Sequence, residues 1–180
     1  MAESGSSNGV VVGVADMAVA REGQGQLITY ALGSCIGLSA YDPVAKVGGL
    51  LHYMLPQPSD QADPKALKPF MYASTGIPSL LRKLLDAGAV QARLVFCAAG
   101  GAEILEGAAH MAIGKRNRTI LRKVLWKLGV SLAAEDTGGS IARTMSLHLS
   151  KGEVRVRTRE NDGVLWAPGM KVVVSRSLES

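Results

Sequence analysis

Hydrophobic positions along the chain recur with two different periods, and these divide it into short strands and two helices. Leucines and isoleucines at helical spacing, each stretch closed by a glycine, predict helices over residues 72–87 and 116–128. Short β-branched or apolar runs bounded by turn-forming residues predict the strands. The expected strands cover residues 10–14, 16–20, 27–30, 36–41, 47–54, 92–98, 130–134, 144–149 and 153–158, with one or two more within 164–174. Many short strands combined with two helices indicate the α+β class.

The domain organisation expected from the sequence is simple. The first nine residues are polar and predict a flexible tail, whereas residues 10–180 contain no linker or internal repeat and predict a single domain. A hydrophobic fraction of 47% with 19% charged residues favours a folded chain over a disordered one. A chain of 180 residues is also long enough to bury a sizeable core.

The charge of the chain restricts its partners and its compartment. A net charge of +5 and a pI near 9.4 favour acidic partners. Aromatic residues make up only 4%, and no recognition motif is present, so we expect no nucleic acid partner. Neither a signal peptide nor an apolar run of membrane-spanning length is found, which predicts a cytoplasmic protein without membrane insertion. The densest basic set, on the helix within 115–127, is either a solvated face or a surface for an acidic partner.

Two cysteines and three histidines supply few combinations for thiol chemistry. The cysteines are far apart, so neither a disulfide framework nor a metal site is indicated. Cys97 lies in an apolar strand, which is typical of a small buried side chain. Cys35 follows Gly33 and Ser34 in a turn whose backbone N–H groups could bind an oxyanion or the substrate. The glycine pair at 100–101 lacks the full fingerprint of a phosphate or dinucleotide loop, so we expect no cofactor.

Cys35 and His52 are expected at the same end of a two-stranded hairpin. Asp42-Pro43 predicts the turn between strands 36–41 and 47–54. A nearby imidazole lowers the pKa of a thiol and takes its proton, so the two residues are a candidate nucleophile and base. The alternative is that Cys35 and His52 are both buried structural residues without a catalytic role. The segment that follows Cys35 could also begin a helix in place of the first strand.

Cys35 and His52 belong to a longer series of motifs that covers most of the chain. It begins with Leu27-x-Thr29-x-x-Leu32-Gly33-Ser34-Cys35, Tyr41-Asp42-Pro43, Gly48-Gly49 and His52-x-Met54-Leu55-Pro56. It continues with Tyr72, Gly100-Gly101-Ala102, Ile113-Gly114-Lys115-Arg116-Asn117 and Glu135-Asp136-Thr137-Gly138-Gly139 with Arg143. In this order, from residue 10 to 158, the chain resembles the chemoreceptor glutamine deamidases of the CheD family.

The resemblance implies a Cys-His-Thr site in which Cys35 is the nucleophile, His52 the base and Thr29 the residue that orients His52. The implied activity is hydrolysis of glutamine side-chain amides on methyl-accepting chemotaxis receptors, with glutamyl methyl esters as further substrates and no cofactor. The implied partners are the cytoplasmic helices of the receptors and a CheC-type phosphatase. The implied fold has two mixed β-sheets packed between helices in four layers (α/β/β/α), as in toxin deamidases.

Two departures from the family pattern keep a second function open. Ala73-Ser74 stands where the family usually has an acidic residue, and Cys97-Ala98-Ala99 replaces the usual lysine and phenylalanine before the Gly-Gly-Ala segment. Neither departure touches the expected site residues, but both could alter the recognition of partners. A non-catalytic chemotaxis adaptor that binds receptors or a CheC-type phosphatase is therefore the alternative.

Overall fold

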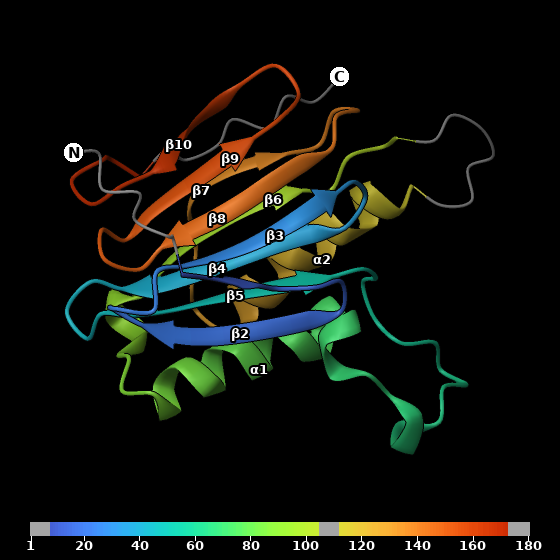
Figure 1. The fold of residues 1–180 in the computed structure, drawn as a ribbon. Helices are drawn as coiled ribbons and strands as arrows, with labels where there is room; N and C mark the ends of the chain where they lie inside the picture. Colours follow the sequence, from blue (N-terminus) through green and yellow to red (C-terminus); the bar gives the residue numbers. More distant parts are fainter. Residues whose placement is uncertain (1–7, 105–111, 173–180) are drawn as a thin grey trace.

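The computed structural model describes residues 8–104 and 112–172, which form two stacked β-sheets and two helices (Figure 1). Sheet A contains β1 (Gly9–Val11), β3 (Gln26–Leu32), β8 (Arg143–His148), β9 (Glu153–Arg157) and β10 (Asp162–Trp166), in that order. Sheet B contains β2 (Asp16–Arg21), β5 (Val47–Tyr53), β4 (Ile36–Asp42), β6 (Val95–Gly100) and β7 (Leu132–Thr137), in that order. The helices are α1 (Ala73–Asp86) and α2 (Ile113–Lys127), and single 3-10 turns lie at Pro64–Ala66, Pro69–Met71 and Gln91–Arg93.

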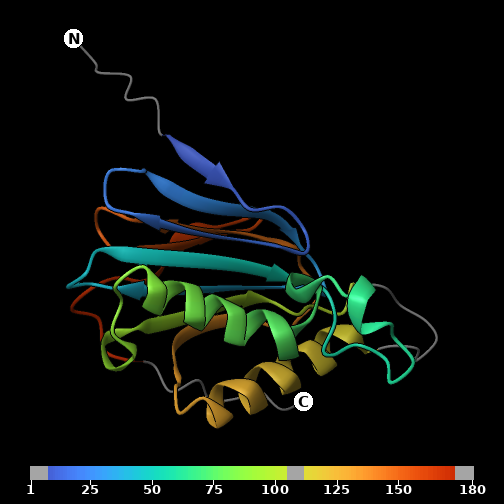
Figure 2. The same cartoon turned by 90° about the horizontal axis from the view of Figure 1, so that it is seen from below.

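The expected α+β class with two mixed sheets and flanking helices is confirmed. Each sheet has a parallel pair, β1 with β3 and β6 with β7, among antiparallel neighbours. Both helices lie on the outer face of sheet B, so the described layers run from helices through sheet B to sheet A (Figure 2). No helix in the described part of the chain covers the outer face of sheet A, so the fourth layer of the expected α/β/β/α arrangement is not found there. No helix of the described residues is long and apolar enough to cross a membrane.

Most predicted elements are found within a few residues of their expected bounds. Both helices form, the 144–149 and 153–158 segments pair as the hairpin of β8 and β9, and the segment after Cys35 is a strand. Of the predicted tail, Asn8 and Gly9 are described, and Gly9 already pairs with β3; residues 1–7 lie outside the described residues. The closing segment contributes one strand, β10, and residues 173 and 174 lie outside the described part.

Sheet B is buried on both faces, and the alternation of its side chains creates two cores. On β5, Leu51 and Tyr53 pack toward the helices, with Ile77, Leu80 and Leu84 of α1. Leu50, the neighbour of Leu51, belongs instead to the core between the two sheets. His52 shares the parity of Leu50, so its side chain enters the space between the sheets.

A buried carboxylate closes the turn between β4 and β5. Asp42 pairs with the guanidinium of Arg93 at 2.8 Å and accepts N–H bonds from Val44, Ala45 and Val90 at 2.8–3.0 Å. Burial alone would raise the pKa of Asp42, but these hydrogen bonds together outweigh burial and hold the pKa well below its usual range.

We expect Asp42→Asn to lower the free energy of unfolding by about 2 kcal/mol at pH 7, a value reduced for the partial exposure of Arg93. Because the pKa is lower in the folded protein, this stability is present above the unfolded pKa of about 3.9 and is lost as the pH falls below it. Urea unfolding at pH 7 and pH 3 should therefore show a smaller difference between variant and wild type at the lower pH. Asp60→Asn, which changes an exposed carboxylate, is the control. An equal loss of stability in this variant would contradict the role assigned to the buried carboxylate of Asp42.

Candidate active site

The antiparallel register of β4 and β5 brings Cys35 and His52 to the same end of sheet B. Gly37 lies directly opposite His52, and Cys35 precedes Gly37 by two residues. Side chains two residues apart share a face, so Cys35 is the diagonal cross-strand neighbour of His52, and both face sheet A. The expected hairpin geometry is confirmed.

Thr29 reaches His52 from the opposite sheet. The Thr29 hydroxyl lies 2.7 Å from His52 Nδ1 and 2.7 Å from the carbonyl oxygen of Val12. A carbonyl only accepts, so the single hydroxyl proton goes to Val12 and Thr29 must accept from His52 Nδ1–H. This assigns the tautomer in which Nε2 carries a lone pair. Nε2 is buried and has no hydrogen-bond partner among the described residues.

The charge states of the pair follow from burial. Burial lowers the pKa of His52 below its ordinary value of 6.5. Burial raises the pKa of the half-buried Cys35 thiol above 9.0, although its own backbone N–H offsets part of this. At neutral pH the site therefore holds a thiol and a neutral imidazole. Burial raises the pKa of Cys97 much further, to about 12, so this second cysteine is unreactive.

Residues 33–35, here called the Cys35 loop, are held through their backbone carbonyls. The carbonyl oxygens of Gly33, Ser34 and Cys35 accept bonds of 2.8–2.9 Å. Their respective donors are the N–H of Ala102, the side-chain amide of Asn117 and the N–H of Gly101. The N–H of Gly33 donates to Ala31, whereas those of Ser34 and Cys35 have no acceptor on another described residue. The N–H groups of Ser34 and Cys35 are therefore the candidates in this loop for binding a ligand.

Glycines stand where backbones approach the site most closely. A Cβ on Gly100, whose φ is +107°, would lie 2.2 Å from the carbonyl oxygen of Cys35. A Cβ on Gly37 would lie 2.9 Å from Leu32 Cδ1 and 3.4 Å from Thr29 Cγ2. The glycine pair at 100–101 is therefore a support for the Cys35 loop, and Gly37 leaves room for Leu32 and for Met145, whose Sδ would lie 3.1 Å from such a Cβ.

Comparison of the sequence with those of known proteins shows the family of this chain. A model described as CheD chemotactic sensory transduction matches residues 54–158. A "Probable chemoreceptor glutamine deamidase CheD" of Solibacter usitatus is 48% identical over 145 residues, 81% of this chain and 86% of the relative. The chain belongs to the CheD family. A CheD 1 protein of Syntrophus aciditrophicus is 42% identical over 83% of this chain and 93% of its own length. A CheD protein of Pyrococcus horikoshii is 42% identical over 82% and 91%.

The structure places most of the residues that the sequence singled out at one end of the two sheets. Thr29 contacts His52 between the sheets, and Cys35 lies at the same strand end without a hydrogen bond to His52 Nε2. The match to the CheD family model begins after these three residues, at Met54. Arg143 and Asp136 form an ion pair of 2.9 Å beside this region.

Asn117 is a site residue that the motif series included but to which sequence reasoning gave no role. Fully buried on α2, it donates through Nδ2 to the carbonyl oxygens of Ser34 at 2.9 Å and Met54 at 2.8 Å. It therefore ties the Cys35 loop to the chain just beyond His52. The signal was present in the sequence, since Asn117 shares the apolar stripe of Leu121 and a polar residue on such a stripe indicates a buried hydrogen-bonded role.

Replacing Asn117 by leucine keeps its volume but leaves two partly buried carbonyls without the donor that Asn117 supplies. We expect Asn117→Leu to lower the free energy of unfolding by about 2 kcal/mol and to slow alkylation of Cys35 by iodoacetamide in the folded protein. Denaturant unfolding and mass-spectrometric labelling measure the two effects, with Thr119→Val on the exposed side of α2 as control. An unchanged labelling rate would show that Asn117 supports the fold without positioning Cys35.

Proposed function

We propose that this CheD-family chain hydrolyses the side-chain amides of selected glutamines in methyl-accepting chemotaxis receptors, leaving glutamate and releasing ammonia. The observation that carries the proposal is the hydrogen-bond chain from Val12 through Thr29 to His52, which leaves Nε2 unprotonated on the face that Cys35 shares. The relatives are named as chemoreceptor glutamine deamidases, which supports the substrate class. The proposal includes a cytoplasmic location, because the substrates that the resemblance implies are the cytoplasmic helices of the receptors.

The proposed reaction begins with proton transfer from the Cys35 thiol to His52 Nε2 as sulfur attacks the carboxamide carbon. The N–H groups of Ser34 and Cys35 stabilise the oxyanion of the tetrahedral intermediate. His52, now an imidazolium whose Nδ1–H is held by Thr29, gives its proton to the leaving nitrogen, and ammonia departs. His52 then takes a proton from water, which attacks the thioester to yield glutamate and restore the Cys35 thiol.

The same thioester would form from a glutamyl methyl ester, with methanol as the leaving group in place of ammonia. We therefore include methyl esters among the proposed substrates. Incubation with receptor fragments methylated at defined glutamates, followed by measurement of released methanol, tests this part separately from deamidation.

The activity itself is tested by incubating the protein with cytoplasmic receptor fragments and mapping glutamine-to-glutamate conversion by peptide mass spectrometry, with ammonia measured in parallel. Conversion at a few defined glutamines is expected. A folded wild-type protein that converts none of them would favour the adaptor function, and binding to receptors or to a CheC-type phosphatase would then be measured by co-purification.

The pH dependence separates a neutral thiol–imidazole pair from a preformed ion pair. Turnover is expected to fall only on the acid side of the ordinary histidine pKa of 6.5, because the lowered pKa keeps His52 neutral above it. Alkylation of Cys35 should still rise above pH 9.0, because burial raises the pKa of its thiol. Both profiles are measured in the Cys97→Ala background, and labelling that reaches a plateau below pH 7 would indicate a thiolate–imidazolium pair instead.

A further inference from the structure

A basic hollow opens at the end of sheet A, next to the Cys35 loop. It has a volume of about 250 Å³ and lies where β8 begins and β9 ends. We call it the arginine hollow, and its polar side chains are Arg143, Thr144, Arg157, Thr158 and Arg159.

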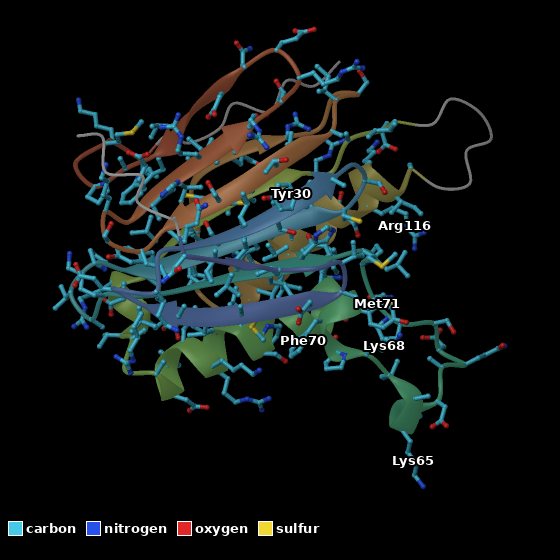
Figure 3. The ribbon with its side chains drawn as sticks, viewed as in Figure 1. Tyr30, Lys65, Lys68, Phe70, Met71 and Arg116 are labelled. Atoms are coloured by element: carbon cyan, nitrogen blue, oxygen red, sulfur yellow. The ribbon has the colours of Figure 1, made fainter. Side chains whose placement is uncertain are left out.

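The arginine hollow is connected to the candidate active site through β3. Ala31, which lines the hollow, lies in a β-bulge after Thr29 and has a φ of +56°. Its carbonyl oxygen accepts the N–H of Gly33 at 3.0 Å, so the wall of the hollow continues directly into the Cys35 loop. Tyr30 of β3 and Arg116 at the start of α2 lie toward this same end of the molecule (Figure 3). The arginine hollow and the Cys35 loop therefore adjoin each other along the chain, through Ala31 and Leu32 at the end of β3.

Positive charge in the arginine hollow is only partly neutralised. Arg143 is nine-tenths buried and pairs with Asp136 at 2.9 Å, yet its Nε has no acceptor within residues 8–104 and 112–172. Arg157 and Arg159 have no carboxylate partner in the described part of the chain. By contrast, Arg155, on the same face of β9 as Arg157, is held between Glu153 at 3.2 Å and Asp162 at 3.1 Å.

The chemistry of the arginine hollow fits a carboxylate. A guanidinium presents paired N–H donors that match the two oxygens of a carboxyl group. None of the described residues that line the hollow is aromatic, so they give a nucleobase no surface on which to stack. We propose that the arginine hollow binds an acidic side chain of the substrate protein near the reacting glutamine and so selects which glutamines are converted. This inference rests on the proposed deamidation.

The first test compares variants that lose the same charge. Arg157→Gln and Arg159→Gln are each expected to lower kcat/KM for receptor-fragment deamidation about tenfold, mainly through KM. Arg155→Gln, equal in charge and already paired, should stay within about twofold of wild type, which separates a local subsite from general charge steering. Equal losses in all three variants, or none in Arg157→Gln and Arg159→Gln, would overturn the proposal.

The second test changes the substrate. Receptor fragments in which the acidic residues flanking a converted glutamine are neutralised should react about tenfold less well with wild type, but no worse with the Arg157→Gln, Arg159→Gln double variant. Inorganic phosphate and acetate, added as competitors, show whether a free anion occupies the same place. If the losses of kcat/KM from the arginine substitutions and from the neutralised substrate are additive, the arginines and the acidic residues do not interact. That result would refute the subsite.

A binding measurement keeps this inference separable from the proposed function. Calorimetric affinities of the receptor fragment for the double variant and for Arg155→Gln are compared in the Cys35→Ala background, where no turnover occurs. Weaker binding of the double variant alone supports the subsite even if wild type converts no glutamine. Conversion by wild type together with equal affinities would reject the subsite and leave the deamidase proposal intact.

Discussion

Cys35→Ala is expected to lower glutamine deamidation by at least about a thousandfold, because no other described group near His52 supplies a thiol to form the acyl intermediate. The substitution removes one half-buried sulfur, so the fold and receptor binding should be retained. Cys35→Ser should be nearly as inactive, because a hydroxyl is far less acidic than a thiol and the lowered pKa of His52 makes this imidazole a weak base.

Cys97→Ala is the matched control for this result. Cys97 is a fully buried thiol whose pKa is raised to about 12, so its loss should leave kcat unchanged and affect stability alone. The measurement is peptide mass spectrometry of receptor fragments over a time course, with far-UV circular dichroism of each variant. Conversion that persists in Cys35→Ala, or that disappears in a folded Cys97→Ala protein, would contradict the assignment of the nucleophile.

Thr29→Val should reduce kcat about a hundredfold with little change in KM. Valine has nearly the shape of threonine but cannot accept the His52 Nδ1–H, so the imidazole loses the contact that sets its tautomer and orientation. The carbonyl of Val12 also loses its 2.7 Å donor, which should cost about 1–2 kcal/mol of stability.

Thr29→Ser separates the hydroxyl from the methyl group of Thr29 and is expected to keep most of the activity. Steady-state kinetics on receptor fragments, together with the pH profile of kcat, distinguishes orientation of His52 from simple loss of stability. A Thr29→Val protein with unchanged kcat would show that packing between the sheets is enough to hold His52.

Local features of the chain favoured the hairpin that carries Cys35 and His52, although the segment after Cys35 could also have begun a helix. Asp42 accepts the N–H bonds of Val44 and Ala45 that close the predicted turn, and alternation along β5 determines that His52 shares a face with Leu50. The apolar stripes of α1 and α2 likewise determined both helices and the sides they bury. All of these depend on residues close together in sequence, where turn chemistry and the strand or helix period act directly.

The third residue of the site and its support were decided by tertiary structure. Thr29 was assigned a role only through a family resemblance, and it contacts His52 because sheet A stacks on sheet B. Asn117 reaches the Cys35 loop only because α2 packs back onto the ends of β4 and β5. Periodicity determines which face of an element is buried, but not which distant element covers it. The sequence by itself therefore determined the turn at Asp42 and the face that His52 shares with Leu50. The packing of distant segments decided which residues contact His52 and hold the Cys35 loop.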